Sequence, residues 1–143
     1  MLRWLIILVA ILGLVTASLA LREHYRTGTS PCSINDVWDC GTVNHSQYAV
    51  FLGVPVAVIG MGGYLLLAVL SLRKLWWALL ICALGGLAFS LYLTRIEWKV
   101  LQVWCIYCVF NVCTILLLTL LALLQAFLQR AKSHSRTAIT NAS

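Results

Sequence analysis

The sequence predicts an all-α integral membrane protein: a bundle of four transmembrane helices, with a long extracytoplasmic loop between the first and second helices. Three observations favour this fold class. Of the 143 residues, 62% are apolar and only 10% are charged, whereas about a quarter of an ordinary soluble domain is charged. Four apolar stretches reach or approach the roughly 20 residues that a helix needs to cross a bilayer. One long polar segment interrupts them.

The expected spans are the four apolar stretches, at about residues 4–21, 51–72, 75–94 and 101–128. A spanning segment must satisfy its backbone polar groups internally, and these runs are too long for barrel strands, so helices are expected. With the polar loop over residues 22–50, they form one membrane domain over residues 1–129. Residues 130–143 are predicted to be a polar, basic cytoplasmic tail.

The first apolar stretch has two interpretations. Arg3, the apolar run that follows it, and the small residues Ser18 and Ala20 also fit a secretory signal peptide. An uncleaved helix is preferred, because the run is longer than the roughly 7–15 apolar residues of a signal peptide core. Cleavage would also leave three spans, with the new N-terminus and the basic tail on opposite sides of the membrane.

The distribution of charge predicts the orientation of the bundle. The N-terminus, the turn at residues 73–74 and the tail share one side, which carries six of the ten Lys and Arg residues and no acid. The positive-inside rule therefore places both termini in the cytoplasm. The long loop then faces the extracytoplasmic side, most simply the periplasmic face of a bacterial inner membrane. Because this explains the net charge of +6, the bilayer is expected as partner and nucleic acid is not.

Four of the six cysteines gather on the extracytoplasmic side. Cys32 and Cys40 lie in the long loop, and Cys105 and Cys108 form a C-x-x-C at the start of the fourth span. Disulfides form and persist in such a compartment. Residues i and i+3 share a helix face, and a helix N-terminus favours the thiolate that attacks disulfides. A dithiol just below the membrane surface is reachable by a lipid-soluble oxidant, for which a quinone is the obvious candidate.

The loop pair has two possible roles. Cys32 and Cys40, with seven residues between them, can close a disulfide that simply staples the loop. Beside a C-x-x-C on the same face, a redox relay is favoured, in which the loop pair visits a water-soluble protein and passes two electrons on through mixed disulfides. Zinc is the rival explanation. Sites with four thiolates usually combine two short C-x-x-C knuckles, so no metal is expected.

Three other side chains with reactive groups have no role in the predicted chemistry. Cys82 and Cys113 fall within spans, where a free cysteine usually serves as a small packing residue. His45 lies in the loop and is interpreted as a surface histidine, with the tuning of a thiolate as the alternative.

Taken together, these residues resemble the vitamin K epoxide reductase family, specifically its bacterial members, from about Leu5 to Leu124. The resemblance rests on Cys32 and on the segments CGTVNHSQYA (residues 40–49), GVP (53–55) and WCIYC (104–108). It implies a four-helix bundle around a quinone, with the outer loop across the mouth of the quinone site.

The resemblance also implies a role for each site residue. Cys108 would face the quinone, Cys105 would exchange with Cys40, and Cys32 would meet the partner protein. Ser46 matches a serine that the family places near the quinone carbonyl. A hydroxyl donor there would favour the negative charge that develops as the quinone is reduced.

Two departures from the animal enzymes bear on the substrate. Val112 stands four residues after Cys108, where those enzymes carry a tyrosine, and Ala49 stands where they carry a quinone-binding asparagine. A respiratory quinone, ubiquinone or menaquinone, is therefore expected. Many bacterial relatives carry a fused thioredoxin-like domain. This sequence runs about fifteen residues past the last span, so a separate partner protein is expected.

The predicted function is quinone-dependent disulfide formation. Two electrons would pass from an extracytoplasmic thioredoxin-like protein of the DsbA type to Cys32 and Cys40, then to Cys105 and Cys108, and finally to the quinone. The alternatives are a vitamin K quinone or epoxide reductase proper, and a non-enzymatic metal-binding or structural membrane protein. DsbB-type quinone reductases are a further functional alternative, since they also have four spans and two cysteine pairs. Their C-x-x-C lies in the first outer loop, so the order of the two pairs is the reverse of the order here. A transporter is disfavoured because all four acids are expected in connections rather than in spans.

Overall fold

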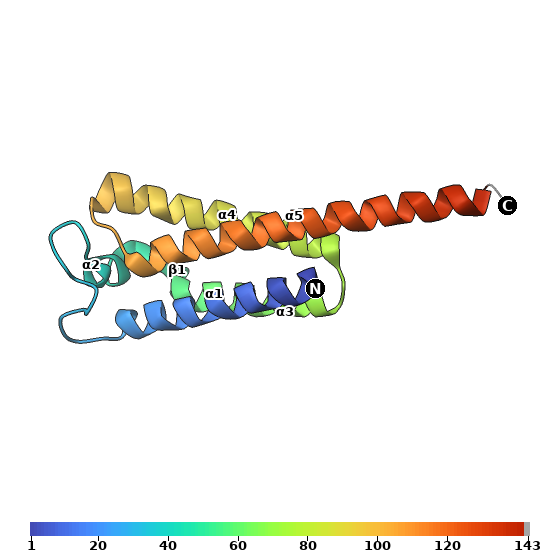
Figure 1. Ribbon diagram of the computed structural model, residues 1–143. Coiled ribbons are helices and arrows are strands. Elements are labelled where there is room, and N and C mark those ends of the chain that lie inside the picture. Colours follow the sequence, from blue (N-terminus) through green and yellow to red (C-terminus); the bar gives the residue numbers. More distant parts are fainter. Residues whose placement is uncertain (142–143) are drawn as a thin grey trace.

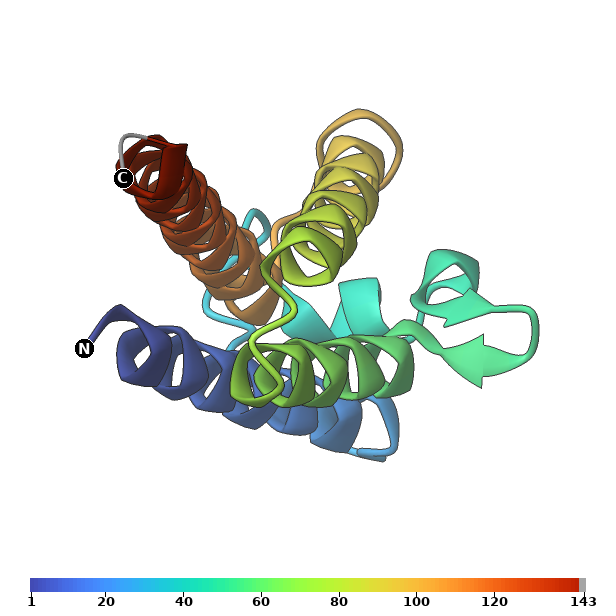
Figure 2. The same cartoon turned by 90° about the vertical axis from the view of Figure 1, so that its right-hand side faces the viewer.

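Four long helices run along a common direction in the computed structural model, which describes residues 1–141, with side chains through residue 134 (Figure 1). They are α1 (Leu2–His24), α3 (Val56–Leu72), α4 (Trp76–Ile96) and α5 (Ile106–Asn141). α1 packs against α3 and α5, and α4 packs against α5 and α3. Viewed from the end, the bundle consists of the α1–α3 pair beside the α4–α5 pair (Figure 2).

Three helical segments of the described chain are long and apolar enough to cross a membrane. They are Leu2–His24, Trp76–Leu101 and Ile106–His134, with 23, 26 and 29 residues. These segments contain most of the first, third and fourth predicted spans. The helix α3 is apolar but has 17 residues, at the short end of the range that spans a bilayer. The second span therefore stays a prediction.

The second predicted span begins too early. Residues 51–55 are not helical, because β1 (Val50–Phe51) and β2 (Val54–Pro55) form an antiparallel hairpin before α3. Leu52 and Gly53 connect the strands with φ of 52° and 82°, and positive φ at both positions of a two-residue loop gives the turn that matches strand twist. Pro55 has no N–H to donate and stands immediately before the helix, where proline is well tolerated.

The predicted loop is shorter than expected and contains structure. α1 continues to His24, so the first residues of the expected loop are helical. Within the loop lie the short helix α2 (Cys40–Asn44) and the 3₁₀ turn η1 (Gln47–Ala49). The loop and α2 sit at the end of the bundle opposite the N-terminus (Figure 1).

The predicted tail is an extension of α5. The helix continues to Asn141 and projects beyond the other three helices (Figure 1). Gln, Arg, Ala and Lys, which are good helix formers, dominate the residues just after 128. Residues 142 and 143 of the predicted tail lie outside the described residues. The end of α5 at Asn141 and the N-terminus lie at the same end of the bundle (Figure 1), as the charge distribution predicts for two cytoplasmic termini.

The helices meet through a core in the middle of the bundle. Ile6, Leu79 and Leu118 are fully buried there. Gly13 permits a close approach of α1 to α3, because a Cβ at this position would overlap the ring of Tyr64. The outer surface of the helices is apolar as well, with Leu12 and Phe127 more than half exposed. A bilayer would cover these side chains.

Candidate functional site

Asp39 starts the helix that carries Cys40. Its Oδ1 accepts hydrogen bonds from the N–H groups of Gly41 (3.0 Å) and Thr42 (3.2 Å). At the start of a helix such N–H groups have no carbonyl partner within the helix. The hydroxyls of Ser33 and Thr42 also donate to this carboxylate. These hydrogen bonds, with that of Ser33 the strongest influence, hold the pKa of the Asp39 carboxyl below its usual value. Cys40 is thereby fixed as the first residue of α2.

Backbone hydrogen bonds fasten this loop to the segment before α5. The N–H of Asp39 donates to the carbonyl oxygen of Trp104 (3.1 Å), and the N–H of Trp104 donates to that of Val37 (2.8 Å). The rings of Trp38 and Trp104 lie 6.5 Å apart. Cys105 directly follows Trp104, so these contacts bring the two cysteine pairs together although they are far apart in the sequence.

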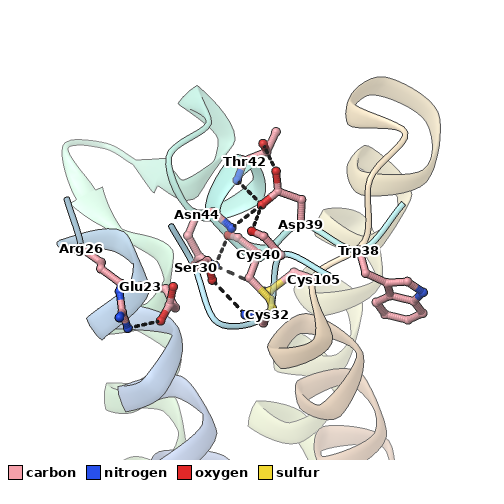
Figure 3. Close-up of a disulfide and its surroundings, with 12 residues drawn as sticks. Glu23, Arg26, Ser30, Cys32, Trp38, Asp39, Cys40, Thr42, Asn44 and Cys105 are labelled. Carbon is pink, nitrogen blue, oxygen red and sulfur yellow. Dashed lines mark hydrogen bonds and ion pairs between the residues drawn. A yellow bond between two sulfur atoms is a disulfide. The ribbon is translucent and has the colours of Figure 1, made fainter. Parts of the chain in front are cut away.

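Three sulfur atoms meet at this junction. Cys32 and Cys40 form a disulfide, and the sulfur of Cys105 lies within 4.8 Å of both of theirs (Figure 3). Cys40 and Cys105 are fully buried, and Cys32 is 7% exposed. A thiol beside a disulfide is the arrangement that thiol–disulfide exchange requires. The structure therefore brings together three of the four predicted cysteines.

Asn44 connects the two pairs by hydrogen bonds. Its Nδ2 donates to the carbonyl oxygen of Cys40 (2.8 Å) and to the sulfur of Cys105 (3.6 Å). A donor directed at a sulfur favours the thiolate over the thiol. No role was predicted for Asn44 from the sequence. Its position four residues after Cys40, on the same helix face, was the available signal.

Glu97 is the second residue that sequence reasoning missed. Its Oε2 accepts a hydrogen bond from the N–H of Cys105 (3.3 Å), and the Cys108 thiol is a further partner of the carboxyl group. The prediction that all four acids lie in connections is wrong for this residue and for Glu23. Helix α4 continues into the π-helical segment η2 (Glu97–Leu101), which holds Glu97 at 2% exposure, and Glu23 is buried in the last turn of α1.

Cys108 faces a different environment from Cys105. It borders a cavity of about 450 Å³ among the helices, whose lining is predominantly apolar. Ser46 and Glu97 also line this cavity. The structure thus places the predicted quinone-binding residues, Cys108 and Ser46, on the same cavity. The Ser46 hydroxyl itself donates to the carbonyl oxygen of Val43 (2.8 Å).

A small polar network lies deeper in the cavity wall. The Tyr64 hydroxyl donates to Oδ1 of Asn111 (2.8 Å), and Nδ2 of Asn111 donates to the Ser90 hydroxyl (3.0 Å). All three residues border the cavity. An apolar cavity of a few hundred Å³ with a few fixed polar groups is typical of small-molecule sites. The lining fits a quinone, which combines an apolar ring and tail with two carbonyl oxygens.

The remaining residues noted in the sequence lie around this site. Cys82 borders the cavity, and Cys113 is exposed on α5. His45 contacts two carbonyl oxygens, that of Gly41 through Nδ1 (2.8 Å) and that of Arg26 through Nε2 (3.1 Å). These contacts tie α2 to the end of α1, which gives His45 a structural role.

The three clustered sulfurs also bear on metal binding. Among the residues that the structure describes, Cys32, Cys40 and Cys105 form the one group of three side chains close enough to share an ion. Thiolates are the ligands that zinc prefers. Two of the three sulfurs are joined in the disulfide, so a metal could use them only after reduction.

Comparison with known protein families places this geometry in context. The model of the vitamin K epoxide reductase family matches residues 4–123, a range that contains the loop, both cysteine pairs and all residues of the cavity. A comparison with curated proteins found no match. Because the family match covers most of the chain, this protein belongs to the vitamin K epoxide reductase family and is a membrane thiol oxidoreductase.

Proposed function

We propose that this protein is a quinone-dependent thiol oxidoreductase that generates disulfides in a separate thioredoxin-like protein of the DsbA type. The placement of the sulfurs carries the proposal. Cys105 lies within 4.8 Å of both disulfide sulfurs, and Cys108, one helical turn further on, borders the apolar cavity. The two pairs therefore connect the aqueous loop to a site suited to a lipid-soluble acceptor.

The first step is oxidation of the partner. A thiolate of the partner attacks the sulfur of Cys32, the S–S bond to Cys40 breaks, and Cys40 leaves as a thiolate. The second thiol of the partner then resolves the mixed disulfide and releases Cys32. Attack at Cys32 is favoured because Cys32 is 7% exposed whereas Cys40 is fully buried, and exchange depends on access to the sulfur.

The second step is internal exchange. The Cys40 thiolate attacks the sulfur of Cys105 in an oxidised Cys105–Cys108 pair, and Cys108 leaves as a thiolate. Cys32 then attacks Cys40, which restores the loop disulfide and releases Cys105 as a thiolate beside the Asn44 amide.

The third step restores the Cys105–Cys108 disulfide. When bound, a quinone supplies an acceptor for two electrons and two protons. Cys108 and Ser46 would hold its reacting end, and the apolar walls of the cavity would exclude water. Ala49 also lines the cavity, and the absence of an amide there supports ubiquinone or menaquinone rather than vitamin K epoxide. Vitamin K quinone or epoxide reduction remains the alternative.

The proposed setting is a bacterial inner membrane. Residues 1–129 would form the membrane domain, with α3 as the second of its four spans and both termini in the cytoplasm. The cysteine loop would then face the periplasm. The concentration of Lys and Arg at the end of the bundle opposite α2 supports this orientation.

Anaerobic quinone reduction tests the proposed function. Purified protein with a small dithiol donor should produce quinol, and Cys108→Ala should reduce this rate to the uncatalysed background. Cys113→Ala, which removes an exposed cysteine elsewhere on α5, is the matched control and should retain activity. Quinol formation that persists in Cys108→Ala contradicts the assignment, and so does its absence from the unsubstituted protein.

Metal binding is the second candidate function, favoured by the three clustered sulfurs. It predicts that reduced protein binds zinc stoichiometrically and reduces no quinone. Metal analysis of the protein used in the quinone assay separates the two functions.

A further inference from the structure

Glu97 is buried at the point where the dithiol meets the cavity. It is 2% exposed. Its carboxyl group contacts the N–H of Cys105 and the thiol of Cys108, and it borders the cavity. It therefore touches the reacting cysteine on one side and the space for the electron acceptor on the other.

Within the described residues, Glu97 has no cationic partner. The ion pair found there joins Arg26 to the other buried glutamate, Glu23. The remaining titratable groups on the cavity come from α1, the loop, α3, α4 and α5, and they are His24, Tyr48, Tyr64, Cys82, Tyr107 and Cys108. An unpaired acid inside a membrane bundle is expensive and commonly marks a proton pathway.

We propose that Glu97 is the proton acceptor for Cys108. In this step the S–H bond of Cys108 breaks, an O–H bond forms on the Glu97 carboxylate, and Cys108 remains as a thiolate. No electrons are exchanged, and the total charge of the pair is unchanged. The inference rests on the proposed function for its direction. The Cys108 thiolate that leaves the internal exchange takes up a proton to give the resting dithiol, and Cys108 needs to lose this proton again before it reduces an acceptor.

The position of Glu97 also gives the proton an exit. Because the carboxyl group borders the cavity, the proton can leave toward the acceptor, which needs two protons as well as two electrons. Glu97 would thus supply one of them without opening the site to water. A purely structural role for Glu97 would be to accept a hydrogen bond from the N–H of Cys105 at the start of α5. That role involves no exchange of a proton with Cys108.

Thiol alkylation distinguishes these roles without a quinone. The rate at which iodoacetamide modifies Cys108 is measured against pH by mass spectrometry, in a Cys105→Ala background that keeps the backbone N–H. Two groups that share a proton titrate in two steps that belong to the pair. The profile should therefore show two inflections with Glu97 present and one in Glu97→Gln. Glu23→Gln, a matched change at the other buried glutamate, should retain both.

Two results would overturn the proposal: a single inflection with Glu97 present, or two inflections that survive Glu97→Gln. If Glu97→Gln does not fold, infrared titration of the parent protein decides. The Glu97 carboxyl band and the Cys108 S–H band should change at the same two pH values. Bands that titrate independently contradict a shared proton.

The quinone assay separates this inference from the proposed function. Glu97→Gln should slow quinol formation at neutral pH by roughly 10²-fold, at the low end of general acid–base catalysis. An unchanged rate overturns the role of Glu97. If the alkylation profile is as expected but the parent protein forms no quinol, the proposed acceptor is wrong and the proton exchange stands.

Discussion

Asn44 is the side chain that links the chemistry of the two cysteine pairs. It is buried, with 8% exposure, and one amide group serves both the Cys40 carbonyl and the Cys105 sulfur. Its donor would stabilise the thiolate that Cys105 becomes when the loop disulfide re-forms. The rate of internal exchange should depend on it.

Asn44→Ala is expected to slow exchange between the pairs by about fivefold, because a hydrogen bond of this kind contributes on the order of 1 kcal/mol. Rapid-quench alkylation after addition of a dithiol measures that rate. Asn35→Ala is the control, since Asn35 makes hydrogen bonds to Val37 and Trp38 in the same loop without touching a sulfur. Equal rates for Asn44→Ala and the parent protein would remove Asn44 from the mechanism.

Asp39 makes the loop sensitive to acid. Its pKa is lowered in the folded loop by the hydroxyls of Ser33 and Thr42 and by the N–H groups of α2. A lowered pKa means that the carboxylate stabilises the fold fully above its unfolded value of about 3.9, and that this contribution is lost as pH falls through the lower folded value. The effect is therefore confined to pH below about 4.

The amide hydrogens at the start of α2 should therefore lose protection from exchange as the pH falls below about 4, after correction for the intrinsic rate. Asp39→Ala should remove this dependence and destabilise α2 by about 1 kcal/mol at neutral pH, as for other lost helix caps. Hydrogen exchange read by mass spectrometry measures both effects. Protection in the parent protein that does not vary with pH would contradict this role of the carboxylate.

At the scale of single elements, hydropathy predicted the presence of each long helix better than the residues at which it begins and ends. The hairpin at residues 50–55 is apolar enough to pass as part of a span, because hydropathy does not distinguish strand from helix. Gly53 and Pro55 were the local signals for a turn and a helix start. The π-helical segment η2 had no such signal, so burial of Glu97 could not be predicted from the residues around it.

The helix α3 determines the topology of the bundle. If it spans the membrane, its two ends lie on opposite sides, with Arg73 in the cytoplasm and Arg26 outside. A membrane-impermeant thiol reagent should then label Arg26→Cys in intact cells, and should label Arg73→Cys only after lysis. Labelling is measured above that of the unsubstituted chain. Labelling of both positions in intact cells would show that the 17 residues of α3 do not cross.

At the scale of the whole molecule, the sequence predicted that the two cysteine pairs lie at the same end of the bundle, and the structure places them there. Spacing and hydropathy sufficed for the C-x-x-C and for its location at the start of a helix. Local sequence patterns could not predict that Cys105 lies beside the loop disulfide, because this proximity depends on the backbone contacts between Trp104 and the loop. The family resemblance implied the pairing of Cys40 with Cys105, and the cluster of sulfurs supports it.

The exchange between Cys40 and Cys105 is the central link in the proposed route, and trapping it tests the account most directly. In a Cys32→Ala, Cys108→Ala double variant, these two cysteines lose their usual partners. Mild oxidation followed by peptide mapping without reduction should find a Cys40–Cys105 disulfide, while the single variant Cys108→Ala should keep the Cys32–Cys40 bond. A double variant in which Cys40 and Cys105 stay unlinked under the same oxidation would contradict the proposed route.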